Sequence, residues 1–351
     1  MAELSKRERV IRTMNQRETD RVPIYDILQN DGLIEHLAER CLTVEDGDAT
    51  KAVAIGRCLD MTRMPGGPSA PGVERRDDGI VIQRERWTSW IIERPWRDRA
   101  GMMAWIGARI DEANGQAFDA SYAARFYATM AHHQSAFGDD TVQVVESGVG
   151  LTEMYWALGW ESFSYLLADE PDLLKAWLDA RHRAELRRVA AIADPRHILI
   201  ALPYDDIAYK TSTLLSPSWL REHWFPRLGR LVDAWHTRDV RCLFHSDGHL
   251  WPVMDDLVAA GIDGLNPIEV AAGMTVRQVR ERYPDLFLTG GIDVSQLLPL
   301  GTPEEVFAAC RENILATGGL GYFLGSSTEL HWEIPLDNIL AMFRAARETS
   351  V

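Results

Sequence analysis

The second half of the chain alternates between short apolar runs and longer amphipathic stretches, and this alternation limits the fold more than any other feature. The apolar runs lie at residues 197–206, 240–248, 262–269, 286–293 and 320–327. The stretches with helical spacing lie at about 217–238, 251–260, 275–283, 303–317 and 335–348. Helix starts favour Ser, Thr and Pro, and most of these stretches begin with one of them. Short strands that alternate with helices are typical of parallel β/α units, and five units without a sign of a sheet edge favour a closed barrel.

The first half is less regular. Residues 20–28 and 141–150 have the pattern of strands, and helices follow the second of them. Between them, residues 72–96 alternate in polarity and are rich in Trp and Ile, which predicts an inserted β-hairpin. Such an insertion suits a lid over a pocket, a subunit contact or an added layer over the barrel helices. We expect one α/β domain over residues 1–351.

The composition excludes several kinds of partner. The chain has 52 acidic and 37 basic residues and a formal net charge of −15, so we expect it to bind neither nucleic acid nor anionic membranes. No apolar run approaches the ~20 residues that a membrane helix needs. The N-terminus is charged rather than signal-like, and the four cysteines form no Cys-x-x-Cys pair. We therefore expect a cytoplasmic protein in which most of the thiols are buried.

Polar side chains follow the apolar runs at the points where the predicted strands end. They are Tyr25, Glu146, Tyr204, Asp205, Asp206, His245, Asp247, Asn266, Glu269, Asp293, Glu329 and His331. The carboxyl ends of barrel strands face one cavity, where the active sites of such barrels are built. Local hydrogen bonds that cap helices or hold loops explain any single residue equally well. The whole ring is harder to explain by packing, because buried unpaired carboxylates are costly.

The pair His245 and Asp247 has the most specific chemistry of this ring. The two residues are two positions apart at the end of an apolar run, so in extended chain their side chains leave the same face. An imidazole and a carboxylate that point together can hold a metal ion, transfer a proton or bind a polar ligand.

Residues 205–269 and 273–293 resemble the uroporphyrinogen decarboxylase superfamily. The likeness extends to residues 7–24, 301–306 and 335–343, so it covers nearly the whole chain. The resemblance implies a distorted eight-stranded β/α barrel of the TIM type, in agreement with the pattern of strands and helices. With the insertion near residues 72–96, this is the fold that we predict.

The resemblance implies two kinds of activity, and the first predicted loop bears on the choice. Members that decarboxylate uroporphyrinogen carry an arginine-rich loop after the first strand, which binds the carboxylates of the substrate. Residues 25–31 read YDILQND here, with two acids and no arginine. A tetrapyrrole with many carboxylates would be repelled rather than bound by arginine forks. The sequence therefore disfavours uroporphyrinogen as the substrate.

The other branch contains the corrinoid-linked methyltransferases. Members that activate a thiol hold zinc with a His-x-Cys motif and a later cysteine. His245 matches the histidine, whereas Asp247 and about Thr328 stand where the two cysteines would be. The implied metal site is then His245, Asp247 and Glu329, with zinc as the first candidate and His331 as an alternative ligand. Without a metal, His245 and Asp247 would act as acid and base.

We therefore predict a methyltransferase that moves a methyl group between a small methoxy-type substrate and a corrinoid carried by a partner protein. Asp205, Asp206 and Glu146 are the further acid/base candidates. The expected substrate contacts are Tyr25, Tyr204, Asn266, Glu269, Asp293 and His331. The alternatives are a decarboxylase or lyase for a small carboxylated substrate without corrinoid, and a non-catalytic ligand-binding barrel. By analogy with similar barrels, we expect a homodimer.

Overall fold

The computed structural model describes residues 3–138 and 140–350. Within them, short parallel strands close into an eight-stranded barrel. The strands are β1 (Tyr25–Asp26), β3 (Met61–Thr62), β7 (Val142–Gln143) continued by β8 (Val145–Ser147), β9 (Ile200–Pro203), β10 (Arg241–His245), β11 (Gly264–Ile268), β12 (Phe287–Ile292) and β13 (Tyr322–Ser326). Each strand pairs in parallel with the next. Ile24 bridges to Leu324 and closes the ring, so the predicted barrel is confirmed.

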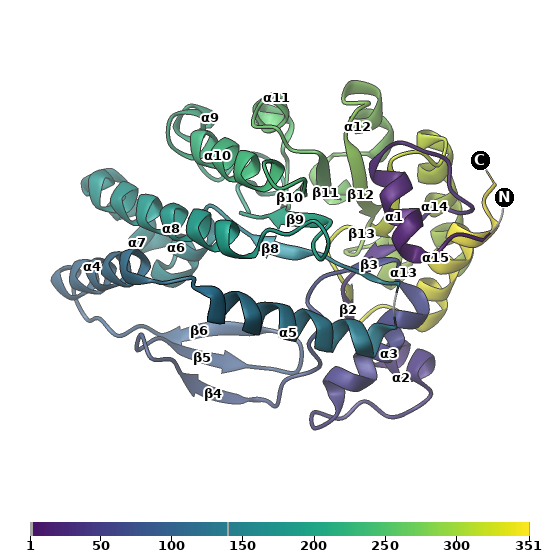
Figure 1. Ribbon diagram of the computed structural model, residues 1–351, viewed down its shortest axis with the longest axis horizontal. Coiled ribbons are helices and arrows are strands. Elements are labelled where there is room, and N and C mark those ends of the chain that lie inside the picture. The colour runs from purple at the N-terminus through teal and green to yellow at the C-terminus, as the bar shows by residue number, and fades with distance from the viewer. Residues whose placement is uncertain (1–2, 139, 351) are drawn as a thin grey trace.

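Helices surround the barrel (Figure 1). They are α1 (Lys6–Met14), α2 (Asp31–Ala38), α3 (Gly47–Cys58), α4 (Arg99–Gly115), α5 (Ala120–Phe137), α6 (Leu151–Leu158), α7 (Trp160–Asp169), α8 (Pro171–Ile192), α9 (Pro217–Trp219), α10 (Phe225–His236), α11 (Met254–Ala259), α12 (Val276–Arg282), α13 (Leu297–Leu300), α14 (Pro303–Thr317) and α15 (Leu336–Glu348). A π-helical turn, Leu220–Trp224, joins α9 to α10. No helix of the described residues is long and apolar enough to cross a membrane.

The strands are buried on both faces, as parallel strands under helices must be. One face contributes to the cluster that fills the barrel, which includes Met61, Leu202, Leu243 and Phe323. Val10 of α1 belongs to the same cluster, so α1 covers the end of the barrel where the strands begin. The functional end is therefore the opposite one, where the strands end.

The predicted insertion is an antiparallel sheet of three strands rather than a hairpin of two. Its strands are β4 (Gly72–Arg75), β5 (Val81–Arg84) and β6 (Ser89–Glu93). The sheet lies below α4 and α5 in Figure 1. Asp31 of α2 anchors its last turn, because it accepts hydrogen bonds from Arg86 Nε and Trp87 Nε1, both at 2.7 Å.

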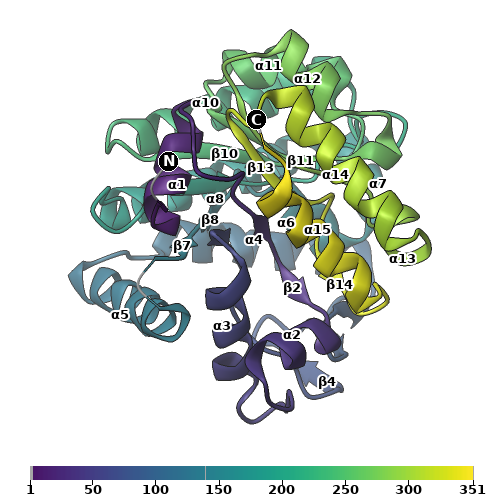
Figure 2. The ribbon, with the colours of Figure 1, turned by 90° about the vertical axis from the view of Figure 1, so that its right-hand side faces the viewer.

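The first and last β/α units of the chain also meet outside the barrel. Strand β2 (Leu28–Gln29) pairs in parallel with β14 (Leu330–His331). In Figure 2, β2 and α2 lie close to β14 and α15. Asn30 Nδ2 donates to the backbone carbonyls of His331 and Ile334, both at 2.9 Å, and fixes this contact. The loop after β1 is thus tied to the loop after β13 at the mouth of the barrel.

Candidate functional site at the mouth of the barrel

His245 ends strand β10 and is held in one orientation by the next two strands. Its Nδ1 lies 2.6 Å from Asn266 Oδ1, and Asn266 Nδ2 donates to Thr289 Oγ1. Because the amide nitrogen of Asn266 is directed to Thr289, its oxygen accepts a hydrogen bond from the Nδ1–H of His245. The other ring nitrogen, Nε2, then keeps its lone pair for a metal or a substrate.

Two carboxylates lie beside this ring and form with it what we call the mouth cluster, Asp206, His245 and Asp247. Asp206 Oδ1 is 3.8 Å from His245 Nε2 and accepts the Asp247 N–H at 3.2 Å. The three residues each offer one ligand atom within 4.8 Å of the others. Asp247 Oδ1 is buried and has no hydrogen-bond partner among the described residues. The cluster therefore contains a carboxylate oxygen without a partner close to the ring nitrogen that carries the lone pair.

Burial sets the protonation of the mouth cluster. It raises the pKa of Asp247 to about 8, and the nearby carboxylates of Asp206, Glu269 and Glu329 add to this rise. Burial lowers the pKa of His245 well below its ordinary value, and the Arg63 guanidinium adds to the effect. At neutral pH the imidazole is therefore uncharged while Asp247 retains a proton.

Arg63 is a residue of this site that the sequence analysis missed. It follows β3, and its Nη2 lies 3.4 Å from both ring nitrogens of His245. Its Nη1 lies 3.5 Å from Glu146 Oε1, and the side chain is 10% exposed. A largely buried guanidinium thus lies among the acids of the mouth. The signal in the sequence was weak, because the residues before Arg63 read LDMT and do not form an apolar run.

Asp205 is next to the mouth cluster in sequence but has different contacts. It accepts hydrogen bonds from the backbone N–H of Gly150 and Thr152, at 3.1 and 2.7 Å, and from Trp224 Nε1 at 2.9 Å. Burial raises the pKa of this carboxyl to about 6. Both of its oxygens hold the start of α6, which is a positioning role, and its predicted catalytic role stays a prediction.

The group of ligand atoms within 4.8 Å of one another contains Asp206 and not Glu329, and the ligand role of Glu329 stays a prediction. Glu329 is close enough to raise the pKa of Asp247, yet the ligand atoms within 4.8 Å of one another belong to Asp206, His245 and Asp247. Glu269 accepts the N–H of Gly248, whose φ of +101° favours glycine, and so holds the loop after β10.

The predicted substrate contacts Asp293 and His331 make hydrogen bonds within the loops that carry them. Asp293 Oδ1 accepts the Ser295 N–H at 2.7 Å. His331 has both ring nitrogens engaged, since Nε2 lies 3.1 Å from the Val294 carbonyl and Nδ1 accepts the Glu333 N–H at 3.2 Å. Both residues thus make local contacts, and their predicted contact with substrate stays a prediction.

The two predicted tyrosines lie at different depths. Tyr25 is buried inside the barrel, and its hydroxyl has no partner among the described residues. Burial raises its pKa to about 12. Tyr204 lines a cavity of about 590 Å³ together with Asp206, and burial also raises its pKa to about 12. Both hydroxyls are therefore protonated at neutral pH.

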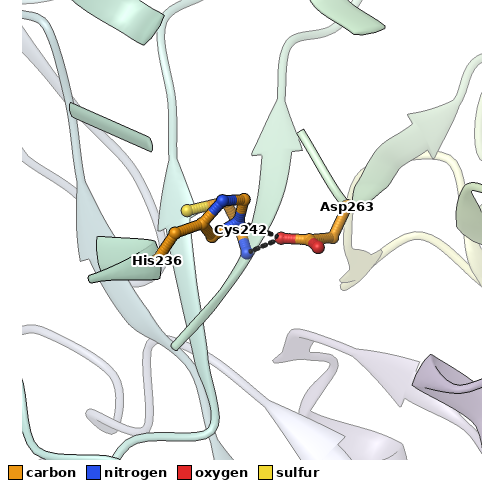
Figure 3. Close-up of side chains that lie close together, drawn as sticks. All are labelled: His236, Cys242 and Asp263. Carbon is orange, nitrogen blue, oxygen red and sulfur yellow. Dashed lines mark hydrogen bonds and ion pairs between the residues drawn. The ribbon is translucent and has the colours of Figure 1, made fainter. Parts of the chain in front are cut away.

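A second group of ligand-type residues lies at the other end of β10, and we call it the floor cluster. It consists of His236, Cys242 and Asp263 (Figure 3). Asp263 accepts hydrogen bonds from His236 Nε2, the Cys242 N–H and Arg241 Nη1, all at 2.7 Å. Burial raises the pKa of the Cys242 thiol well above its ordinary value. With its carboxylate already engaged and its thiol protonated, this cluster is a structural contact.

The arrangement so far is that of a β/α barrel with a polar site at the carboxyl ends of its strands. The sequence profile of the uroporphyrinogen decarboxylase (URO-D) family matches residues 132–349. The chain belongs to this family.

Two relatives extend the comparison. A methylated-thiol–coenzyme M methyltransferase of Methanosarcina mazei is 29% identical over 143 residues, which are 40% of this chain and 36% of that protein. The chain thus matches just over a third of the length of this curated relative. A solved structure of a methyltransferase from Methanosarcina mazei superposes with a TM-score of 0.70 at 18% identity, over 99% of both chains, and has the same fold.

Proposed function

We propose that this chain is a methyltransferase that moves a methyl group between a small methoxy-type substrate and a corrinoid held by a partner protein. The observation that carries the proposal is the mouth cluster, in which an oriented imidazole lies beside a buried carboxyl with an unused oxygen. The methyltransferase names of the two relatives support the reaction type. The first loop supports it as well, because Asp26 is buried there and accepts from the Ser326 N–H and hydroxyl, where a uroporphyrinogen site would need arginines.

The donor set suits a divalent metal ion. His245 Nε2, Asp206 and Asp247 would hold it, and zinc is the first candidate because it accepts mixed nitrogen and oxygen ligands. The bound ion would supply Lewis-acid polarisation of the substrate heteroatom. Oxygen ligands in place of thiolates suit an oxygen-bearing substrate better than a thiol, which is why we favour methoxy compounds.

The residues of the chain can also stabilise the leaving oxygen directly. The corrinoid supplies the nucleophile for the methyl carbon. When the carbon–oxygen bond breaks, its electron pair stays on the substrate oxygen, and protonated Asp247 donates a proton to that oxygen. Arg63 provides positive charge at the same place. The ligand and proton-donor roles of Asp247 exclude each other, so metal content decides between them.

The test combines activity with metal analysis. The purified chain is incubated with cob(I)alamin and a panel of methoxylated compounds, and methylation of the cobalt is followed by absorbance. We expect transfer from at least one donor, and a loss of about 100-fold or more in His245→Ala. His236→Ala, a floor cluster variant, is the matched control and keeps the activity. Failure of every donor in a broad panel would refute the proposal.

A second candidate function is the decarboxylation of a small carboxylated substrate. The observation that favours it is Arg63, a cation at the mouth that can bind a carboxylate beside the acid Asp247. Release of carbon dioxide without any corrinoid, abolished in Arg63→Met, would support this alternative over methyl transfer.

A further inference from the structure

The contacts that Arg63 makes at the mouth of the barrel are long. Its guanidinium nitrogens lie 3.4 Å from the ring nitrogens of His245 and 3.5 Å from Glu146 Oε1, which is more than the usual length of a hydrogen bond. Its Nε is buried and has no partner among the described residues. The position of the guanidinium therefore depends on the backbone that carries it. This backbone is the start of the loop 63–68, which leads from β3 to the inserted sheet.

Lys51 of α3 forms two hydrogen bonds to this loop. Its Nζ donates to the carbonyl of Met64 at 2.9 Å and to the carbonyl of Gly66 at 2.8 Å. Met64 has a φ of +53°, a conformation that residues with a side chain rarely adopt, so the turn needs contacts that hold it. The two hydrogen bonds supply such contacts directly after Arg63.

The start of α3 also holds the far end of the loop. Asp48 Oδ1 accepts the Gly67 N–H at 2.6 Å. A Cβ atom at Gly67 would overlap the backbone of Gly47 and Asp48, so the loop lies directly against the helix. One helix therefore supplies both an acceptor and a pair of donors to the segment that follows Arg63.

The surroundings of Lys51 show that its amine is not there for packing. The residue is 2% exposed, and its Nζ lies 5.1 Å from the centroid of the Trp87 ring. Burial lowers the pKa of Lys51 to about 7, and both of its hydrogen bonds go to backbone carbonyls rather than to a carboxylate. An apolar side chain would pack against the indole without the loss of hydration that an amine suffers. The donors of Lys51 are therefore the part of the side chain that has a use.

From these contacts we infer that Lys51 is a positioning residue, which holds the loop 63–68 so that the Arg63 guanidinium lies beside His245. Lys51 touches neither the mouth cluster nor a substrate, and it acts through the backbone that follows Arg63. The effect of Lys51 on methyl transfer rests on the proposed function. The placement of Arg63 rests on the hydrogen bonds of the loop alone.

The first experiment follows the placement of Arg63 without any substrate. The full chain is produced with isotopically labelled histidine, and the ring-nitrogen NMR signals of His245 are identified by their loss in His245→Gln. Arg63→Met should shift these signals, because the positive charge of Arg63 acts on this ring. Lys51→Met keeps an apolar side chain but lacks the donors, and we expect it to shift the signals in the same direction. In the Arg63→Met background it should cause no further shift.

The second experiment measures methyl transfer in the same variants. Arg63 provides its charge where negative charge develops, so a misplaced guanidinium affects the transition state more than substrate binding. We expect Lys51→Met to lower kcat about tenfold with little change in KM. The double variant should be no slower than Arg63→Met, because Lys51 acts through Arg63. A role in stability alone would leave kcat per folded molecule unchanged.

The chain offers a matched control and a second way to move the loop. Lys6 of α1 also donates to a backbone carbonyl, that of Gly56, but lies at the opposite end of the barrel. Lys6→Met should leave both kcat and the His245 signals unchanged. Gly67→Ala should displace the loop by the overlap of its Cβ atom while Lys51 is intact, and should shift the His245 signals as well. Melting temperatures establish that each variant is folded.

The outcomes separate this inference from the proposed function. Unchanged His245 signals in Arg63→Met, or in both loop variants when folded, would overturn the inference. So would losses of kcat that multiply in the double variant of Lys51 and Arg63. Shifted His245 signals in a protein without any methyl transfer would support the positioning role and contradict the proposed function alone.

Discussion

Strand β10 carries a group of ligand-type side chains at each end, and the two groups differ in how their hydrogen bonds are used. In the floor cluster, Asp263 receives donors from His236, Arg241 and the Cys242 backbone. In the mouth cluster, Asp247 Oδ1 receives none from the described residues. Both clusters pair an imidazole with a carboxylate, so residue type alone does not separate them. The unpartnered oxygen of Asp247 separates them. A buried polar atom without a hydrogen-bond partner lowers the stability of the fold, and a bound ligand can offset that loss.

The largest expected effect is on activity. Asp247→Asn keeps the shape of the side chain but removes the acidic proton and the ability to bind a metal as a carboxylate. We expect methyl transfer to fall about 100-fold or more, the usual contribution of an acid/base group. Asp263→Asn, the equivalent change in the floor cluster, should keep its activity per folded molecule. If Asp247→Asn and Asp263→Asn lost methyl-transfer activity equally, the difference in hydrogen bonding between the two clusters would not identify the active site.

The second effect is on stability, and here we expect the floor cluster to matter more than the mouth cluster. Asp263→Ala leaves His236, Arg241 and the Cys242 N–H without their shared acceptor, so we expect the free energy of unfolding to fall by about 3 kcal/mol. Asp247→Ala removes a buried carboxyl with an unused oxygen and should be as stable as the wild type or more so. Urea denaturation of both variants gives the two values. A floor cluster variant as stable as the wild type would show that its hydrogen bonds have no structural role.

The sequence predicted the parts of the molecule with strong periodicity. The stretch 303–317 coincides with α14, where Thr302 and Glu305 form a capping box, and 335–348 differs from α15 by one residue. Strand β3 was missed because its two residues are too few to show a period.

Arg63 follows that missed strand and was missed with it. The choice between Asp206 and Glu329 depended on the paths of loops between strands, which no local pattern encodes. The inward or outward direction of Asp293 and His331 likewise follows from loop contacts.

A smaller effect is expected at the residue that orients His245. Asn266→Ala removes the acceptor of the Nδ1 proton while leaving all three members of the mouth cluster in place. If the site holds zinc, the affinity for zinc should fall about 10- to 100-fold, as is usual when the hydrogen-bond partner of a histidine ligand is removed. Competition with a chelator of known affinity measures this. Thr237→Ala, next to the floor cluster, is the control and should leave zinc affinity unchanged, since its hydroxyl donates to the Ala234 carbonyl within its own helix end. Unchanged affinity in Asn266→Ala would refute the orienting role.

The smallest effect concerns His182 of α8, a buried histidine that belongs to neither cluster. Its Nδ1 has no partner among the described residues, and burial together with Arg230 and Arg227 lowers its pKa to about 4. Below pH 6.5 the unfolded chain binds a proton that the folded chain does not, so stability decreases as the pH falls from 6.5 toward 4.

We expect the contribution of His182 to be a loss of about 1 kcal/mol between pH 7.5 and 5.5, and His182→Gln should remove it from the difference in unfolding free energy between these two pH values. Methyl transfer at pH 7.5 should be the same in this variant and the wild type. Such a result would sharpen the comparison, because this unpartnered buried nitrogen would then affect stability alone. A loss of methyl transfer in folded His182→Gln would instead show that unpartnered atoms do not distinguish the functional end of the barrel.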